Sequence, residues 1–475
     1  MWWNSGGGPK NHEAAETYIL RAALRNLFFF AFMLTEAFIN ERCAVILGSN
    51  AVNPVYTVGL VCTGLGFLSF SLLRRLCKKE KSRKTAQIII GVLCLGAALV
   101  LLFADHPALF LTSSAAALLL TGHISGCVYY NTAMYFAASR YMGRLIGTGM
   151  GVAILLQFVV QNLMPQSVAF IISIFFSVAF VMYFIMKAPK DWILENPLPY
   201  SPETQKDFKK ALLLIVAVVL MSLVAGMIDS VLTAFNAEKS YDIYSGVRLF
   251  YALGLILAGV LADIRERKYL PLSTVCTILL SSVCVFFLSD EVSYFAGTAL
   301  MYLYSGFYVI FFTVMFLDFA PKSGNPELWA GMGRIVRSFT VAATVLPALT
   351  IYGAVGNTAL AVGSCLLSIL ILLVLLPYLS NVAVSAKPTG ELPSDSPARS
   401  PQERLKLFAQ HCSLTPRETE VLEQLLTTED GVQEIADSLY ISRRMVQRYI
   451  ASIYAKTQTK TRLGLFQSYM NFTAE

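Results

Sequence analysis

Arginine and glutamine side chains recur at helical spacing near the end of the chain, between Arg443 and Lys456. At about 100° per residue, Val446, Ile450 and Ile453 fall on one face and should pack inward. The opposite face carries Arg444, Arg448, Ala451 and Ala455, and Gln447 and Arg443 lie on its flank. The small alanines allow close approach to DNA, and the polar side chains can hydrogen-bond to phosphates and base edges. This pattern predicts a helix able to enter the major groove of DNA.

Two shorter patterns precede this helix and predict the elements that position it. Thr415 can cap free backbone amides, Pro416 suits a first helical position, and Glu418 can close a capping box. An apolar stripe then follows at helical spacing: Val421, Leu422, Leu425 and Leu426. After a break at Asp430-Gly431, a second helix presents an inner face, and a serine caps the third helix: Ile435, Ala436, Leu439 and Ser442.

Charge is polarised along this C-terminal region. Residues 403–437 contain eight acidic and three basic residues, whereas residues 438–475 contain six basic and one acidic residue. A domain that is basic at one end is typical of a helix that approaches DNA phosphates. The region therefore predicts a small helix-turn-helix domain.

About 50 residues here resemble the LuxR-type helix-turn-helix family. The matching residues, in order, are Leu414-Thr-Pro-Arg-Glu, Val421-Leu422, Glu434-Ile-Ala, Ile441-Ser442, Val446, Ile453-Tyr454, Lys456 and Arg462. The resemblance implies DNA binding as a homodimer that pairs through a fourth helix, here roughly 462–471. The sequence departs from the family on the reading face, at 445–449, and at the turn 457–459.

We predict double-stranded DNA as the partner of this domain. The predicted contacts come from the exposed helix face and from two basic residues that match the family: Arg443, Arg444, Gln447, Arg448, Ala451, Lys456 and Arg462. A three-helix module for protein contacts is the alternative.

The rest of the chain has the composition of a membrane protein. Of its 475 residues, 56% are hydrophobic and only 14% are charged, whereas soluble proteins carry about 25% charged residues. The net charge is +7, and the nine cysteines show no paired metal spacing. No small-residue cleavage site closes the first apolar run, so we expect it to be retained. Contact with membrane lipid is expected, but no metal or cofactor.

Twelve apolar segments are long enough to cross a membrane, because about 20 helical residues span the hydrocarbon core. They are 24–48, 52–73, 86–104, 108–138, 145–163, 167–187, 211–235, 243–263, 270–289, 294–319, 331–353 and 357–379. We therefore expect an all-α fold: a polytopic membrane helix bundle followed by the helix-turn-helix domain.

Basic residues alternate between the loops of this bundle. They gather at 74–84, 140–144, 187–210, 265–268 and 322–337, the last including Lys322, Arg334 and Arg337. The loops between these have almost none, with Lys239 the main exception. Because positive loops stay in the cytoplasm, this pattern predicts an inner-membrane, multi-pass protein with both termini cytoplasmic.

A long proline-containing loop divides the twelve segments into two halves of six. This layout resembles the major facilitator superfamily, and Gly259-Val-Leu-Ala-Asp263-Ile-Arg265-Glu-Arg267-Lys268 resembles the loop motif of that family. The equivalent first-half loop, 66–75, lacks the acidic residue. The resemblance implies a solute cavity between the halves.

Composition changes abruptly after residue 379. Pro388, Pro393, Pro397 and Pro401 occur with serine, threonine and glycine, which predicts a linker reaching roughly 25 Å. The expected parts are a cytoplasmic N-terminus (1–23), a first membrane half (24–187), a cytoplasmic loop (188–210), a second half (211–380), the linker (381–402) and the helix-turn-helix domain (403–475).

Polar residues inside the predicted spans are candidates for ligand binding, because charge at membrane depth is unfavourable unless it has a function. They are Glu36, His123, Gln157, Asp229 and Arg248. Tyrosines could line a cavity with them: Tyr129, Tyr130, Tyr251, Tyr302 and Tyr304. The alternative is structural: ion pairs Glu41–Arg42 and Asp229–Arg248, and a hydrogen-bonded core His123.

Three functions fit these features. A one-component regulator would sense an unidentified small molecule through the membrane domain and bind promoter DNA through the C-terminal domain. A transporter would use the DNA-binding domain to regulate its own operon, and a membrane scaffold would use it for protein contacts. The sequence contains no catalytic constellation, so we do not expect an enzyme.

Overall fold

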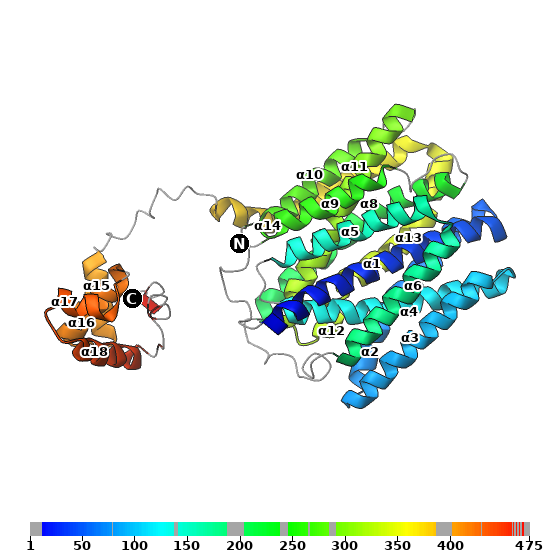
Figure 1. The fold of residues 1–475 in the computed structure, drawn as a ribbon. Coiled ribbons are helices and arrows are strands. Elements are labelled where there is room, and N and C mark those ends of the chain that lie inside the picture. The colour runs from blue at the N-terminus through cyan, green and yellow to red at the C-terminus, as the bar shows by residue number, and fades with distance from the viewer. Residues whose placement is uncertain are drawn as a thin grey trace. The chain divides into compact units, whose positions relative to one another are not determined.

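The protein is helical in a computed structural model, which describes residues 12–77, 79–136, 141–187, 204–237, 246–264, 267–284, 291–385, 401–428, 430–457, 459, 462, 465 and 468–469. Within these ranges no β-strand occurs, which confirms the all-α prediction. The chain divides into two compact units, Met1–Ala386 and Lys387–Glu475 (Figure 1). Most of the predicted linker lies outside the described residues.

Each of the twelve predicted membrane segments overlaps one helix of the first unit. These are α1 (His12–Ile46), α2 (Val52–Leu76), α3 (Glu80–Phe103), α4 (Pro107–Phe136), α5 (Met142–Leu163), α6 (Gln166–Lys187), α8 (Thr204–Ala237), α9 (Arg248–Ala262), α10 (Tyr269–Cys284), α11 (Glu291–Phe319), α13 (Met332–Val355) and α14 (Asn357–Ser385). Of these, α1 and α8 begin before their predicted segments and α14 ends after its own. A short helix, α12 (Pro326–Trp329), precedes α13. The long helices lie side by side in one bundle (Figure 1).

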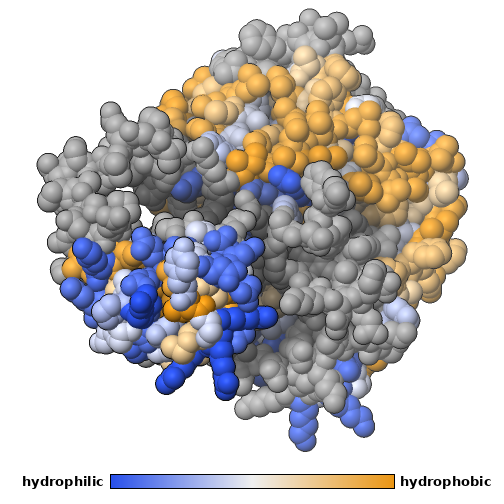
Figure 2. Space-filling view, turned by 60° about the vertical axis from the view of Figure 1, so that its left-hand side comes forward, coloured by the Kyte–Doolittle hydropathy of each residue, from blue (hydrophilic) through white to orange (hydrophobic). Residues whose placement is uncertain are grey.

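Length and hydropathy make this unit membrane-spanning. Within the described ranges, nine helices are long and apolar enough to cross a bilayer, and α9 and α10 are apolar but shorter. The sequence segments predicted for α9 and α10 extend into residues outside the described ranges. Large apolar side chains face outward, such as Val92, Phe176 and Leu366, each more than 60% exposed. Figure 2 shows hydrophobic residues gathered in a broad area of the surface, as contact with lipid requires.

Close glycine contacts join the two halves of the bundle. A Cβ atom on Gly147 of α5 would lie 2.5 Å from the carbonyl oxygen of Leu255 in α9, so only glycine fits there. On the same two helices, Gly259 lies against the backbone of Gly143 and Gly147. Small residues that let membrane helices approach closely are the usual basis of their packing.

The loop motif after α9 reinforces this junction. Asp263 accepts hydrogen bonds from the backbone N–H groups of Gly143 (2.8 Å) and Arg144 (2.7 Å) at the start of α5. Arg267 pairs with Asp263 and also donates to Asp318 of α11 at 2.7 Å. The motif thus links three helices through one buried carboxylate.

The second unit contains α15 (Pro401–His411), α16 (Pro416–Thr427), α17 (Val432–Ser438) and α18 (Arg443–Lys456) around its own core. The predicted apolar faces are confirmed, because Val421, Leu422, Ile435, Val446 and Ile453 are fully buried. Both predicted helix starts are also confirmed: a Thr415–Glu418 capping box begins α16, and the Ser442 side chain caps α18.

Candidate DNA-binding face and membrane cavity

Helix α18 presents the predicted polar face to solvent. Arg443, Arg444, Gln447, Arg448 and Ala451 are all exposed. The opposite side of α18 packs against α16 and α17 through its buried apolar residues. The predicted polar face is therefore exposed on this domain, and its apolar side is fixed by packing.

Lys456, the next residue predicted to contact DNA, is exposed, but its amine is hydrogen-bonded to other residues of the domain. Its Nζ donates to Glu418 Oε2 at 2.7 Å and to the carbonyl oxygen of Ser413 at 3.0 Å. Glu418 also accepts from the Ser452 hydroxyl and from the backbone N–H of Thr415 at 2.7 Å. Burial raises the pKa of Glu418, but the hydrogen bonds from Lys456, Ser452 and Thr415 outweigh it and hold the pKa at about 2.

Arg462 is likewise turned inward. Its guanidinium donates to the carbonyl oxygens of Leu425 and Asp430, each at 2.8 Å, and to those of Gln424 and Thr428. These carbonyls include the unpaired ones that end α16, so Arg462 acts as a cap for that helix. This placement favours a structural role for Arg462.

Most of the fourth helix expected from the family resemblance lies outside the described residues. Among those described, Leu465 is fully buried in the core and the Tyr469 ring meets Phe408 of α15 edge-on at 5.4 Å. The dimer contact expected of this segment stays a prediction.

The polar residues predicted to bind a ligand in the membrane unit fall into separate clusters. His123 bonds through Nδ1 to Ser69 Oγ (2.8 Å) and through Nε2 to Gln87 (3.2 Å), which matches the alternative of a hydrogen-bonded core histidine. Arg248 donates to Gln157 (3.4 Å) and to the Tyr302 hydroxyl (3.3 Å).

The ion pairs expected from the sequence have different partners. Asp229 accepts from Arg337 at 3.2 Å and from the Tyr56 hydroxyl at 3.4 Å, so its ion pair is with α13 and not with Arg248. Arg42 pairs with Asp105 at 3.0 Å. Sequence reasoning considered only neighbouring spans, whereas α8 packs against α13 in the bundle.

Two residues that the sequence prediction counted with the basic region 322–337, and also placed inside the span 331–353, belong to the membrane bundle. Arg334 and Arg337 lie in the first turns of α13, and Arg334 is only 8% exposed. Helix α13 agrees with the predicted span, but the sequence prediction used the two arginines only as a topology signal and not as part of a site. The missed signal is their spacing of three, which places both on one side of a helix.

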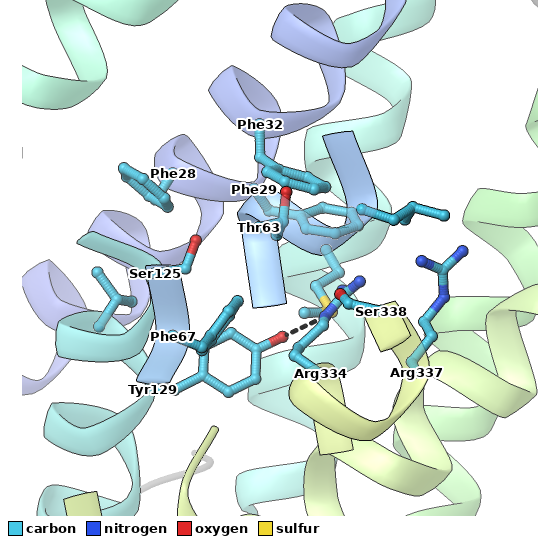
Figure 3. Close-up of a pocket in the computed structure, with 13 residues that line it drawn as sticks. Phe28, Phe29, Phe32, Thr63, Phe67, Ser125, Tyr129, Arg334, Arg337 and Ser338 are labelled. Carbon is cyan, nitrogen blue, oxygen red and sulfur yellow. Dashed lines mark hydrogen bonds between the residues drawn. The ribbon is translucent and has the colours of Figure 1, made fainter. Parts of the chain in front are cut away.

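Arg334 and Arg337 line a cavity within the bundle. Aromatic residues form much of its wall, with hydroxyl groups among them: Phe28, Phe29, Phe32, Phe67, Tyr129, Thr63, Ser125 and Ser338. Figure 3 shows both arginines rising from α13 on one side of the cavity, and Arg334 reaching toward Tyr129. A second pocket containing Glu36 and Tyr56 shares Phe32, Leu60 and Thr63 with this cavity. Of the predicted ligand residues, only Glu36 lines either of these two pockets.

The second unit has the geometry of a helix-turn-helix domain, and the first is a bundle of long apolar helices. Residues 412–468 match the family of bacterial regulatory proteins of the luxR family, so the C-terminal domain is of the LuxR type. The bundle matches the crystal structure of the human organic anion transporter MFSD10 (TETRAN), at 13% identity and a TM-score of 0.56. This match covers 76% of the present chain and 98% of the transporter, and it shows that the two proteins share a fold. No curated protein matches the chain.

Proposed function

We propose that this protein is a membrane-bound, one-component transcription regulator. Its transporter-like unit senses a small molecule, and its LuxR-type domain binds promoter DNA as a homodimer. The observation that carries the proposal is the exposed face of α18, with Arg443, Arg444, Gln447 and Arg448, in the same chain as a membrane bundle that holds a cavity.

The side chains of α18 match the requirements of DNA recognition. Arginine can bond to phosphates or to the O6 and N7 atoms of guanine, and Gln447 can pair with adenine. The exposed Ala451 lets the backbone approach the groove. Lys456 and Arg462 would support this face by fixing α16 against α18 and by capping α16.

The basic loops support a topology in which both termini lie in the cytoplasm and the bundle spans the inner membrane. DNA would then have to reach the membrane surface. A ligand that binds one arrangement of the two halves more tightly than the other would shift the bundle toward it. That shift would alter the pairing or freedom of the tethered domains.

The proposal is tested with purified full-length protein in detergent micelles and a random-duplex library. We expect enrichment of a defined sequence, and affinity that falls steeply between about 50 and 200 mM salt. The double variant Arg444→Ala/Arg448→Ala should lose the enrichment. Arg417→Ala is the matched control, because Arg417 is also exposed but lies on α16, where it pairs with Glu420 at 2.7 Å. Equal binding of every sequence by the unaltered protein would exclude promoter recognition.

The second candidate is a working transporter with an autoregulatory DNA-binding tail, which the fold shared with a transporter favours. Protein reconstituted in liposomes would then accumulate solute, and Glu36→Gln in the second pocket would abolish uptake. A regulator that only senses would bind its ligand without net uptake.

A further inference from the structure

We propose that the cavity lined by Arg334 and Arg337 binds a small organic monoanion with an aromatic or aliphatic body. The inference rests on the proposed sensing function and adds the chemical class of the ligand. The anionic group would bind Arg334, and the apolar body would lie against the phenylalanines of α1 and α2.

Arg334 is the residue that would select a negatively charged ligand. It is more than nine-tenths buried, and its Nε donates to the Tyr129 hydroxyl at 2.9 Å. Its Nη2 is buried and has no hydrogen-bond partner among the described residues. A buried guanidinium is strongly unfavourable unless it is paired, so this atom is directed at a ligand that supplies an acceptor.

The surrounding charges do not neutralise Arg334. Within the described part of the bundle no carboxylate forms an ion pair with Arg334. Asp229 of α8 binds Arg337 and Tyr56 instead. The rings of Phe29 and Phe312 lie 5.5 and 5.2 Å from its guanidinium carbon. Such contacts attract a cation but leave its N–H groups without acceptors. A carboxylate or sulfonate offers two oxygens in the geometry that arginine binds best.

The remainder of the cavity selects the body of the ligand. Its walls come from α1, α2, α4, α5 and α13, and most of the lining side chains are apolar, as is usual for small-molecule sites. Phe28, Phe29, Phe32 and Phe67 make much of its wall apolar, which disfavours a hydrated inorganic anion. Arg337, the other arginine of the wall, already pairs with Asp229 at 3.2 Å, so a ligand with a single anionic group is sufficient for Arg334.

Tyr129 and Ser338 would orient the bound group. Tyr129 holds the guanidinium through its hydroxyl, and the Phe67 ring fixes Tyr129 edge-on at 5.4 Å. Ser338 lies one turn after Arg334 on α13 and also lines the cavity. Its hydroxyl can donate to a second ligand oxygen.

The test measures binding of radiolabelled benzoate, phenylacetate and octanoate to the full-length protein in detergent, with benzamide, benzylamine and inorganic sulfate as comparisons. We expect saturable binding of at least one monoanion with a Kd below about 1 mM, and at least about tenfold weaker binding of the amide and the amine. Arg334→Gln should abolish it. Arg42→Gln, which alters a part-buried arginine outside the cavity, should not.

Tyr129→Phe is a milder second variant that tests the proposal if Arg334→Gln fails to fold. It keeps the ring and removes only the hydroxyl that orients Arg334, so monoanion binding should weaken about three- to tenfold. The proposal is overturned if no monoanion binds up to about 10 mM, if benzamide binds as well as benzoate, or if Arg334→Gln binds like the unaltered protein. Sequence-specific DNA binding, measured separately, would survive each of these outcomes if the proposed function is correct.

Discussion

Lys456 at the end of α18 donates a 2.7 Å hydrogen bond to Glu418 in the first turn of α16. Glu418 simultaneously closes the capping box with Thr415. One buried carboxylate therefore starts the first helix of the helix-turn-helix and holds its last helix in place. The angle at which α18 is presented depends on this pair.

Replacing Lys456 should destabilise the DNA-binding domain more than it weakens any direct DNA contact. Lys456→Met keeps the length of the side chain but leaves Glu418 buried with one partner fewer. We expect a loss of about 1–3 kcal/mol in unfolding free energy by urea denaturation of residues 401–475. Lys406→Met, at an exposed lysine of α15, is the control and should change stability by less than about 0.5 kcal/mol. An unchanged midpoint in Lys456→Met would contradict the structural role of this lysine.

The same carboxylate predicts how the stability of the domain depends on pH. The pKa of Glu418 is lowered to about 2, so its ionised form stabilises the folded state. This contribution is complete above the pKa of about 4.5 in the unfolded chain, and it is lost as the pH falls from there toward 2. The difference in unfolding free energy between the natural domain and Glu418→Gln should therefore be constant from about pH 7 to pH 5 and shrink below that. A difference independent of pH down to about pH 3 would contradict the hydrogen-bond network described.

Replacing Arg462 by glutamine should mainly lower the stability of the domain, whereas replacing Arg443 by glutamine should mainly weaken DNA binding. Arg462→Gln removes the cap on α16 and should lower the unfolding free energy by about 2–3 kcal/mol. Arg443→Gln alters an exposed side chain and should leave stability nearly unchanged while weakening DNA binding and reducing its salt dependence. Urea denaturation and duplex titration of the two proteins separate the roles. If Arg462→Gln instead kept its stability and lost DNA affinity, Arg462 would be a DNA contact.

Asp263 gives a prediction for the membrane unit. Asp263→Asn weakens its bonds to the start of α5 and its ion pair with Arg267, so the melting temperature in detergent should fall by several degrees. Asp105→Asn is the matched control, because Asp105 also pairs with an arginine but is 90% exposed at its side chain. Equal melting temperatures for the two variants would argue against a loop motif that joins the halves.

The helices and their caps could be predicted because their signals are local. Thr415, Glu418 and Ser442 act within one turn of helix, and apolar spacing alone places Val446 and Ile453 in the core. The partners of Asp229, Arg334 and Arg462 could not be predicted in the same way. Each of these side chains meets residues more than 30 positions away in the sequence, so only the packing of the helices brings the partners together.

Arg334 illustrates this limit most clearly. In the sequence it is one of several basic residues beside an apolar segment, and such residues usually remain in the cytoplasm. Its role changes only when α4 and α13 bring Tyr129 to its Nε and the phenylalanines of α1 close the cavity. Lys456 shows the opposite case. The sequence predicted that it contacts DNA, but in the structure it binds the buried carboxylate of Glu418.

The most direct test of the account is genome-wide footprinting of tagged full-length protein in living cells, beside the Arg444→Ala/Arg448→Ala variant at equal amounts in the membrane. We predict discrete occupied promoters for the unaltered protein and loss of that occupancy in the variant. No occupied sites, or the same sites in both proteins, would contradict the assignment of α18 as the DNA-reading element of a membrane-bound regulator.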